Sequence, residues 1–470
     1  MKILQNLVGG RWEPAQHTEL LDLVNPATEQ AIAQFPAGSV ADVDRAVGAA
    51  AEAQRSWAQL PVAERVDRLQ AWATAIIDHA PELAELECSE MGKPVELART
   101  FVVGAVEGFR VAVNEALTYP FTEQFEAPDG SSTTIIRNPL GVAAVITPWN
   151  FSVPMLLTAV GPLLAAGNTV VVKPSERSPL AAGRLFELAD LPPGVVNLVH
   201  GDSRSGEPLV QHPGVNLVHF AGSVESGRKV GASAGGRLVR SVLELGGKDP
   251  VIVDADVDPV TVAQAVAVGA FLNTGQICTS MERIYVHEDV ADAFIEALID
   301  AAGTFALGDG HDEATVLGPL VDDRQRQIVH RHVNDAVAKG AKVKIGGEIP
   351  DRTGYFYPPT VLTDVDESML IMTEETFGPV APIAVVSSFD EAVKLACRTR
   401  FGLAATVYTS NPDHIAAATR IPTGVTWINL WQGGSPDGVF EPAGDSGMGA
   451  SGARASYDAA TRPSSVFAAA

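Results

Sequence analysis

Apolar residues at the start of the chain first occur in short runs and then recur at helical spacing. The runs over residues 1–29 predict short strands. Ser39, with Asp42 three residues later, forms a capping-box pattern that opens a helix. The spacing of apolar positions then predicts a second helix from Pro61 and a third over residues 81–91. Three helices are therefore expected before Gly92.

From Gly141 the pattern changes to strands that alternate with helices. Strands are expected over 142–147, 169–173, 195–200 and 217–221, with helices over 154–166, 179–189 and 206–211. This alternation predicts an α/β fold with a doubly wound parallel sheet. Such sheets bind ligands at the carboxyl ends of their strands, where residues 147–150, 173–176 and 221–223 fall.

A second alternating series follows in the C-terminal half of the chain. Strands are expected over 283–287, 341–345, 356–362 and 404–408, with helices over 290–305, 322–339 and 389–397. We place a boundary between the two α/β parts near Gly246. Cys88 and Cys397 both lie on predicted helices, and both are expected to be core residues.

Composition limits the class of protein. A chain of 470 residues is long enough for two or three domains. The net charge of −24 disfavours nucleic acid or an anionic membrane surface as a partner. Three cysteines form no disulfide framework, and the first twelve residues lack an apolar run of signal-peptide length. A cytoplasmic protein is therefore expected.

Two further features argue against a membrane span and a metal site. The uncharged stretch over residues 141–172 is interrupted by Pro148, Pro154 and Pro162, so a buried strand, loop, helix and strand fits it better. His330 and His332 are two residues apart, which on a helix points them to different faces, and no cysteine joins them. No metal ion is predicted.

Candidate chemistry centres on the stretch from residue 243 to residue 283. Glu244 leaves a strand-like run at the Gly246-Gly247 turn, and Cys278 follows a second glycine-containing loop. Glycines allow backbone conformations that aim a neighbouring side chain into a cleft. A thiol nucleophile with a carboxylate base is one interpretation. A buried cysteine and a solvated glutamate are the other, and spacing alone leaves both open.

Two strand ends carry residues suited to a nucleotide. Residues 222–227 pass from a strand into a helix, where free N–H groups favour a phosphate, although the segment matches no dinucleotide fingerprint and also fits an ordinary turn. Lys173 and Glu176 lie three residues apart on one exit loop and could bond ribose hydroxyls together. A surface ion pair is the alternative for these two residues.

Short motifs then follow one another in a specific order. They are Thr147-Pro148-Trp149-Asn150-Phe151, Ala166-Gly167-Asn168-Thr169 continuing to Lys173-Pro174-Ser175-Glu176, Phe220-Ala221-Gly222-Ser223, Glu244-Leu245-Gly246-Gly247-Lys248, Gly275-Gln276-Ile277-Cys278, Glu374-Glu375-Thr376-Phe377-Gly378-Pro379 and Trp427-Ile428-Asn429. In this order they resemble the aldehyde dehydrogenase superfamily. The resemblance extends over nearly the whole chain, from residues 25–28 to residues 446–449.

The resemblance implies that Cys278 is the nucleophile and Glu244 the base. Attack of the Cys278 thiolate on an aldehyde would give a thiohemiacetal oxyanion, for which the Asn150 amide and the backbone N–H of Cys278 are the expected donors. Loss of hydride to the nicotinamide would leave a thioester. Glu244 would then activate water to release a carboxylic acid.

The resemblance also implies a cofactor site and its residues. The residues expected to bind the cofactor are Trp149, Lys173, Ser175, Glu176, Gly222, Ser223, Gly246, Glu375 and Phe377. A carboxylate at Glu176 would repel a 2′-phosphate, which favours NAD over NADP. NADP stays possible, because Lys173 could turn toward a phosphate.

A three-part organisation follows from the same resemblance. The expected parts are a Rossmann-like cofactor-binding domain over 1–120 and 140–246, an α/β catalytic domain over 247–445, and a small β oligomerisation element over 121–139 and 446–470. The last part would pair subunits into a homodimer or homotetramer.

Departures from the family pattern concern the substrate. The family's Pro-Phe-Gly-Gly falls on Val439-Phe440-Glu441-Pro442, which puts the geometry of that loop in doubt. The expected tunnel is roomy and uncharged, and is lined by Met155, Thr158, Ile277, Thr279, Trp431 and Phe440. It favours a hydrophobic aliphatic or aromatic aldehyde.

Three alternatives remain beside this interpretation. Succinate-semialdehyde enzymes often have an arginine at the position of Thr158, and Arg283 could replace it here. A CoA-acylating dehydrogenase would use CoA in place of water, although a free carboxylate at Glu244 argues for water. A non-catalytic binding protein need not retain the thiol, the base and the oxyanion donor together.

Overall fold

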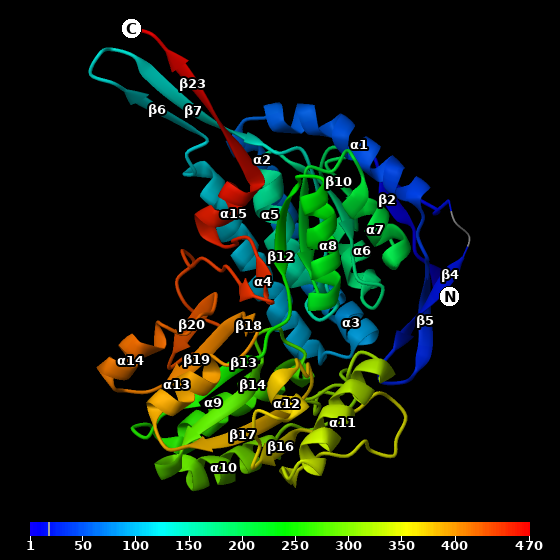
Figure 1. Cartoon of the computed structure of the whole chain (residues 1–470). Helices are drawn as coiled ribbons and strands as arrows, with labels where there is room; N and C mark the ends of the chain where they lie inside the picture. Colours follow the sequence, from blue (N-terminus) through cyan, green and yellow to red (C-terminus); the bar gives the residue numbers. More distant parts are fainter. Residues whose placement is uncertain (17–18) are drawn as a thin grey trace.

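The computed structural model describes residues 1–16 and 19–470 and contains two large sheets, each covered by helices (Figure 1). The first sheet has the strand order β22 (Gly447–Met448), β12 (Arg240–Glu244), β11 (Leu217–Ala221), β8 (Val142–Ile146), β9 (Thr169–Lys173), β10 (Val196–Leu198), β2 (Asn6–Val8) and β3 (Arg11–Glu13). Neighbouring strands from β12 to β10 are parallel, which confirms the predicted doubly wound sheet.

The order of the first sheet creates a binding position. β9 and β10 lie on one side of β8, whereas β11 and β12 lie on the other. The direction of winding therefore reverses between β8 and β11. Loops that leave the carboxyl ends of these two strands diverge, and the crevice between them is where doubly wound sheets bind ligands.

Strands of the first sheet are apolar on both faces because helices cover both. One layer holds α1 (Val40–Gln59), α7 (Ser203–Gln211) and α8 (Val224–Gly236), and the other holds α2 (Val62–Asp78), α4 (Val95–Asn114), α5 (Ser152–Ala165) and α6 (Pro179–Glu187). Val142 and Ala144 pack in the first layer, and Ala143 and Val145 pack in the second. Burial on two sides explains a strand without polar positions.

The second sheet begins immediately after the first one ends. The chain leaves β12 at Glu244 and enters β13 (Asp249–Val253) five residues later. The order is β15 (Lys342–Ile345), β16 (Thr360–Thr363), β17 (Val380–Val386), β14 (Met281–His287), β13, β19 (Ala404–Tyr408) and β20 (Val425–Ile428). Its helices are α9 (Pro259–Phe271) and α10 (Glu288–Ala302) on one face, with α11 (Asp323–Ala338), α12 (Leu370–Thr373), α13 (Phe389–Ala396) and α14 (Pro412–Ala418) on the other.

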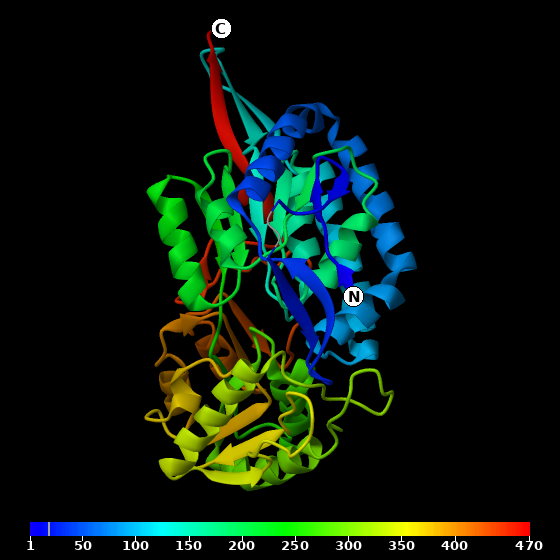
Figure 2. The same cartoon turned by 90° about the vertical axis from the view of Figure 1, so that its right-hand side faces the viewer.

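Three smaller sheets complete the part of the chain that the structure describes, and one of them is the two-stranded pair of β18 (Phe401–Gly402) and β21 (Ala443–Gly444). β6 (Thr122–Glu126), β7 (Ser132–Pro139) and β23 (Thr461–Ala468) form an antiparallel ribbon that projects from the body (Figure 1). β1 (Lys2–Ile3), β4 (Leu20–Asn25) and β5 (Gln30–Pro36) form a second three-stranded sheet. The blue β4–β5 hairpin runs along one side toward the second sheet (Figure 2), where the N–H of Tyr355 donates to the carbonyl of Pro26 at 2.8 Å.

The N-terminal helices begin and end as the sequence indicates. The Ser39 hydroxyl accepts from the N–H of Asp42 and caps α1. α3 (Ala80–Met91) ends at Gly92, whose φ of 83° is left-handed. α4 was not predicted, although its buried Ala98, Val102 and Val106 have helical spacing. In residues 1–16 and 19–470 no helix is long and apolar enough to cross a membrane.

Two expectations differ from the structure. Cys397 is exposed and not in the core, because α13 ends at Ala396 and its buried face is formed by Phe389, Ala392 and Ala396. One residue beyond that face points away from it. The strand expected over residues 356–362 begins only at Thr360, after Pro358 and Pro359, which have no N–H for the ladder.

Candidate active site

A cleft at the carboxyl edge of the first sheet brings together the residues expected to bind a cofactor. It consists of two adjoining cavities of about 690 and 550 Å³, which share Trp149, Glu176, Gly222 and Ser223. Lys173 and Ser175 line the first cavity. The second is lined by Gly246, Glu375 and Phe377, and also by Asn150, Glu244 and Cys278. All of the predicted cofactor residues therefore face one continuous space.

The first cavity lies at the switch point and has the features of a nucleotide site. α8 begins there, with the Ser223 hydroxyl accepting from the N–H of Ser226, so the N-terminus of a thirteen-residue helix faces the space. Lys173 Nζ donates to Glu176 Oε2 at 3.3 Å. Burial opposes ionisation of Glu176, but the charges of Lys173 and Arg177 and hydrogen bonds to the carboxylate together outweigh it and lower the pKa of this carboxyl. An anionic pyrophosphate and a ribose fit this set of donors and acceptors.

Cys278 follows a loop whose backbone has unusual torsion angles. Asn273, Thr274 and Gly275 have φ values of 53°, 61° and 67°. A Cβ at Gly275 would lie 2.1 Å from the carbonyl oxygen of Gly378, so only glycine fits this position. Strain of this kind persists where surrounding contacts hold it, and it is common at functional sites.

Hydrogen bonds fix this loop on both sides. The Asn150 amide donates to the carbonyl of Gln276 at 2.9 Å, and the Gln276 side chain accepts from the N–H of Val321 at 2.9 Å. Thr274 donates to the carbonyl of Gly318 at 3.0 Å. Asn150 is nearly fully buried and lines the cleft with Cys278, and its amide has a second N–H beside the one that bonds Gln276.

The Gly246-Gly247 turn allows Glu244 and Cys278 to come together. A Cβ at Gly246 would lie 2.1 Å from Glu375 Oε2, and one at Gly247 would lie 2.8 Å from the carbonyl of Cys278. A side chain at Gly247 would push the turn after Glu244 away from the loop that carries Cys278, whereas one at Gly246 would displace the Glu375 carboxylate. Close approach to the Cys278 backbone therefore favours glycine at position 247.

Carboxylates surround the thiol. Burial, followed by the charges of Asp249, Glu244 and Glu375, raises the pKa of Cys278 to about 12. Cys278 is half-buried, with its side chain on the wall of the cleft. The thiol is therefore protonated at neutral pH when the cleft holds no positive charge. Burial also raises the pKa of Glu375 to about 8, with Glu282 adding to the effect.

A buried ion pair supports the segment that carries Glu375 and Phe377. Lys248 Nζ lies 2.5 Å from Glu282 Oε2, and both side chains are nearly inaccessible. Glu282 also accepts from the N–H groups of Thr376 and Phe377, each at 2.8 Å. Phe377 has a φ of 52°, and its ring meets that of Trp149 edge to face at 5.6 Å. Glu282, whose charge Lys248 balances, thus holds the backbone of a segment with a left-handed φ at the cleft.

Residues expected in the substrate tunnel are divided in the structure. Met155 and Phe440 line the cleft with Cys278. Thr279 and Trp431 contact each other, because the indole N–H of Trp431 donates to the carbonyl of Thr279 at 3.0 Å. Ile277 is buried and Thr158 is exposed on α5, and neither lines the cleft.

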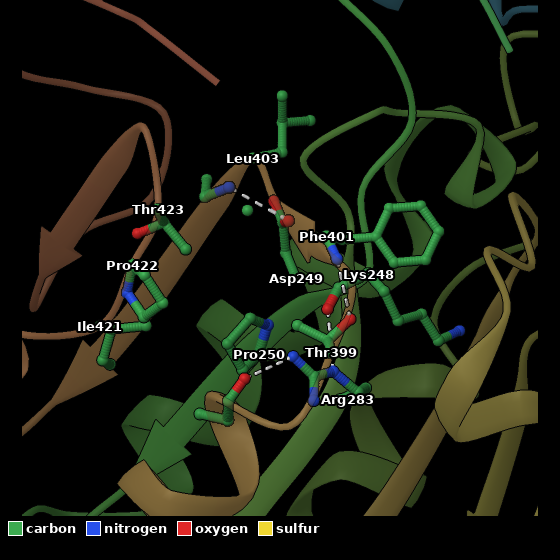
Figure 3. Close-up of a pocket in the computed structure, with 13 residues that line it drawn as sticks. Lys248, Asp249, Pro250, Arg283, Thr399, Phe401, Leu403, Ile421, Pro422 and Thr423 are labelled. Atoms are coloured by element: carbon green, nitrogen blue, oxygen red, sulfur yellow. Dashed lines mark hydrogen bonds between the residues drawn. The ribbon is translucent and has the colours of Figure 1, made fainter. Parts of the chain in front are cut away.

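Arg283 does not face the cleft. It therefore cannot replace the arginine that succinate-semialdehyde enzymes often have at the position of Thr158. It is fully buried on β14, and it donates to the carbonyls of Lys248, Leu395 and Ala396 at 2.8 to 3.2 Å. Figure 3 shows it beside a cavity of about 10 Å³ next to Asp249, which has room for about one water. A substrate carboxylate has no access to this guanidinium.

Ser451 was not predicted from the sequence. Its hydroxyl donates to Glu244 Oε1 at 2.8 Å. Ser451 and Phe440 also exchange two backbone hydrogen bonds of 2.8 Å, which fixes the loop with Glu441 and Pro442 in place of the family's glycines. The contact of Ser451 with Glu244 joins residues 207 positions apart, and no local pattern reveals it.

Comparison with known proteins gives consistent matches over nearly the whole chain. A family model described as "Aldehyde dehydrogenase family" matches residues 12–466. The chain is 40% identical over 410 residues to 3,6-anhydro-alpha-L-galactose dehydrogenase of Streptomyces coelicolor, covering 86% of this chain and 83% of that one. It is 36% identical over 464 residues to phenylacetaldehyde dehydrogenase of Pseudomonas fluorescens, covering 95% and 92%. A solved structure of an indole-3-acetaldehyde dehydrogenase with NAD+ superposes with a TM-score of 0.96 at 32% identity, covering 99% and 97%.

Proposed function

This chain belongs to the aldehyde dehydrogenase family and is an NAD(P)-dependent enzyme that oxidises aldehydes, and we propose that its substrate is a hydrophobic aliphatic or aromatic aldehyde. We propose further that oxidation proceeds through a thiohemiacetal and a thioester on Cys278. The observation that carries this proposal is the meeting of Cys278, Glu244 and Asn150 on one cleft with the cofactor residues.

Cys278 acts as the nucleophile. After the thiol proton has passed to water, the thiolate sulfur attacks the aldehyde carbon, and the carbonyl oxygen becomes an oxyanion as the C–S bond forms. The free N–H of the Asn150 amide and the backbone N–H of Cys278 stabilise that oxyanion. Because burial and nearby carboxylates raise the pKa of the thiol, the thiolate forms more readily when positive charge enters the cleft.

The nicotinamide cofactor, when bound, accepts the hydride that the tetrahedral carbon loses. Lys173, Ser175 and Glu176 would hold the adenosine end, and Ser223 with the start of α8 the pyrophosphate. Trp149, Gly222 and Gly246 complete the walls, and Glu375 and Phe377 would hold the nicotinamide end. The ionised Glu176 disfavours a 2′-phosphate, so we propose NAD as the preferred cofactor, with NADP as the weaker one.

Glu244 acts as the base of the second half-reaction. It removes a proton from water, which attacks the thioester and releases a carboxylic acid with return of the Cys278 thiol. The hydrogen bond from Ser451 restricts the position of the Glu244 carboxylate. Ser451 is therefore a positioning residue for the base.

A hydrophobic substrate is supported by the residues beside the thiol. Met155 and Phe440 present apolar surface next to Cys278. Arg283, the internal arginine that a distal carboxylate would need, is fully engaged with backbone carbonyls. The relative named phenylacetaldehyde dehydrogenase acts on an aromatic aldehyde by its name.

The test is reduction of NAD or NADP by purified protein with short aliphatic, long aliphatic, aromatic, sugar and carboxylate-bearing aldehydes. Exposed Cys397→Ala serves as the matched control for Cys278→Ala. We expect turnover with hydrophobic aldehydes and NAD, retained in the Cys397 variant and lost in the Cys278 variant. Strong preference for short, sugar or carboxylate-bearing aldehydes would contradict the proposed substrate class. Turnover that requires CoA would contradict water as the acceptor.

We also propose that the projecting ribbon pairs subunits into a homodimer or homotetramer, while residues 1–120 and 140–246 bind the cofactor and 247–445 supply the catalytic thiol. The ribbon exposes Phe125, Ile136, Val466 and Phe467, and Phe467 is 78% exposed. Apolar residues on a projecting sheet favour association. β22 pairs with β12 in the first sheet, so within residues 446–470 the projecting strand is β23. Light scattering of Phe467→Asp beside the parent protein tests this association.

A further inference from the structure

Cys88 lies in a second cluster of reactive side chains, outside the cleft. Its sulfur, the Asp309 carboxylate and the His311 imidazole have donor atoms that all lie within 4.8 Å of one another. Cys88 belongs to α3, which packs beside the first sheet. Asp309 and His311 belong to the loop between α10 and α11 of the second sheet. The cluster therefore joins two separate parts of the fold.

Distances in the cluster match the edges of a tetrahedral metal site. Cys88 Sγ lies 3.5 Å from His311 Nδ1, and His311 Nδ1 lies 2.9 Å from Asp309 Oδ1. Zinc binds sulfur at about 2.3 Å and nitrogen at about 2.1 Å, so a tetrahedral angle separates the two ligands by about 3.6 Å. The nitrogen–oxygen edge must lengthen by about 0.5 Å. The sulfur–oxygen edge lies within 4.8 Å, against about 3.6 Å in a tetrahedral site. The same ring nitrogen faces both other donors, as one shared ion requires.

The far side of the imidazole is oriented by other groups. His311 Nε2 lies 3.3 Å from the Ser89 hydroxyl and 3.4 Å from Glu85 Oε2. A carboxylate on the second nitrogen of a histidine fixes its tautomer and ring position when the first nitrogen binds a metal. Glu85 lies three residues before Cys88, so both side chains project from the same face of α3.

The loop approaches Cys88 as closely as a backbone can. A Cβ at Gly310 would lie 2.7 Å from Cys88 Sγ, so only glycine fits between Asp309 and His311. The carbonyl of Gly310 accepts from the N–H of Val95 at 3.0 Å, which fixes the loop against the start of α4. The donors are thus positioned by backbone contacts and not by side-chain flexibility alone.

The electrostatics of the cluster favour a cation. The Asp309 carboxylate belongs to the cluster and the Glu85 carboxylate lies on the far side of the imidazole, so two negative charges lie near the position of an ion. Binding would replace the Sγ–H bond by a bond from sulfur to the metal and release the proton to water.

We propose that Cys88 Sγ, His311 Nδ1 and Asp309 Oδ1 form a binding site for one zinc ion, with the fourth position open to water. One soft sulfur, one imidazole and one carboxylate are a ligand set suited to zinc, and not to magnesium or calcium. His311 and Asp309 are 38% and 43% exposed, which leaves a path for entry. The proposal differs from the sequence prediction, which treated Cys88 only as a core residue.

The ion would stabilise the segment that holds the loop before Cys278 in place. The loop that carries His311 continues to Gly318 and Val321, which bond Thr274 and Gln276 directly before Cys278. An ion that joins this loop to α3 stabilises that support without touching the cleft. The expected role is structural, and it does not depend on the aldehyde chemistry.

The test uses a Cys278→Ala, Cys397→Ala double variant, in which Cys88 is the one cysteine that remains of the three. We expect one Zn²⁺ per chain by titration calorimetry, release of about one proton, and a higher unfolding temperature. Co²⁺ in place of Zn²⁺ should give thiolate-to-metal absorption. These signals should disappear in added Cys88→Ala, His311→Ala or Asp309→Asn.

Controls separate the site from surface acids and from misfolding. His330 lies on α11 and bonds Tyr357, so His330→Ala should leave Zn²⁺ binding unchanged. Glu85→Gln should weaken binding by about tenfold to a hundredfold. Each variant is first compared with its parent without metal by circular dichroism, and Asp309→Asn tests an exposed ligand where loss of Cys88 impairs folding. Absence of Zn²⁺ binding, or binding and Co²⁺ absorption that survive loss of Cys88 and His311, would overturn the proposal.

Discussion

Cys278 and Cys88 are two thiols whose pKa is raised by burial and nearby carboxylates, yet their surroundings differ. Cys278 opens onto a cleft of about 550 Å³ beside an amide donor and a carboxylate. The sulfur of Cys88 is in direct contact with the His311 imidazole, 3.5 Å from Nδ1. The comparison indicates that space for a substrate, and not the pKa of the resting thiol, separates a nucleophile from a ligand.

Replacement of the two thiols should give the largest contrast. Cys278→Ala removes the proposed nucleophile, and kcat should fall by about 10⁴-fold or more. Cys88→Ala should change kcat by less than about threefold, because Cys88 does not line the cleft. Steady-state kinetics on both variants measure this contrast. Similar losses of kcat in both variants, when both are folded, would contradict this contrast.

Removal of the base should slow turnover and make the thiol more reactive. Glu244→Gln should lower kcat by about 10³-fold, because water is no longer deprotonated. The same change removes a negative charge that raises the Cys278 pKa, so the pKa should fall. In the enzyme without cofactor, the rate of Cys278 alkylation should rise about tenfold per pH unit at pH values below the pKa of this thiol. The variant curve should lie toward lower pH, and a curve shifted upward would contradict the role of Glu244.

Loss of the amide donor should have a smaller effect on kcat. Asn150→Ala removes one oxyanion donor and the bond to the Gln276 carbonyl, and kcat should fall by about 10²-fold. The alkylation rate of Cys278 should change much less, because alkylation forms no oxyanion. Parallel loss of both rates would indicate that Asn150 acts only by supporting the loop.

Ser451→Ala should give the smallest effect among these variants. It removes the hydrogen bond that positions Glu244, and kcat should fall by about threefold to tenfold. Ser451→Thr retains a hydroxyl and should restore much of kcat. An unchanged kcat in Ser451→Ala would show that the contact has no role in positioning the base.

Local patterns in the sequence predicted much of the fold. Alternating strands and helices predicted the parallel core of the first sheet, and Ser39 and Gly92 marked helix ends. Cys397 was placed wrongly because helical spacing does not reveal that α13 ends one residue earlier. The start of β16 moved because two prolines remove ladder donors.

The candidate site was predicted in part, through ordered motifs around Glu244 and Cys278. Contacts between distant segments were not accessible from spacing. Ser451 reaches Glu244 across 207 positions, and Cys88 reaches His311 across 223. Such pairs depend on how the two sheets pack. For the same reason the burial of Arg283 against carbonyls of α13 became evident only in three dimensions.

Trapping of the acyl-enzyme tests the central claim most directly. Glu244→Gln enzyme is mixed with an aromatic aldehyde and NAD, quenched in acid and digested, and the cysteine peptides are weighed by mass spectrometry. The account predicts an acyl group on the Cys278 peptide, dependent on NAD, and none on the Cys88 or Cys397 peptides. An acyl group on another cysteine, or reduced cofactor formed without any acyl-cysteine, would contradict it.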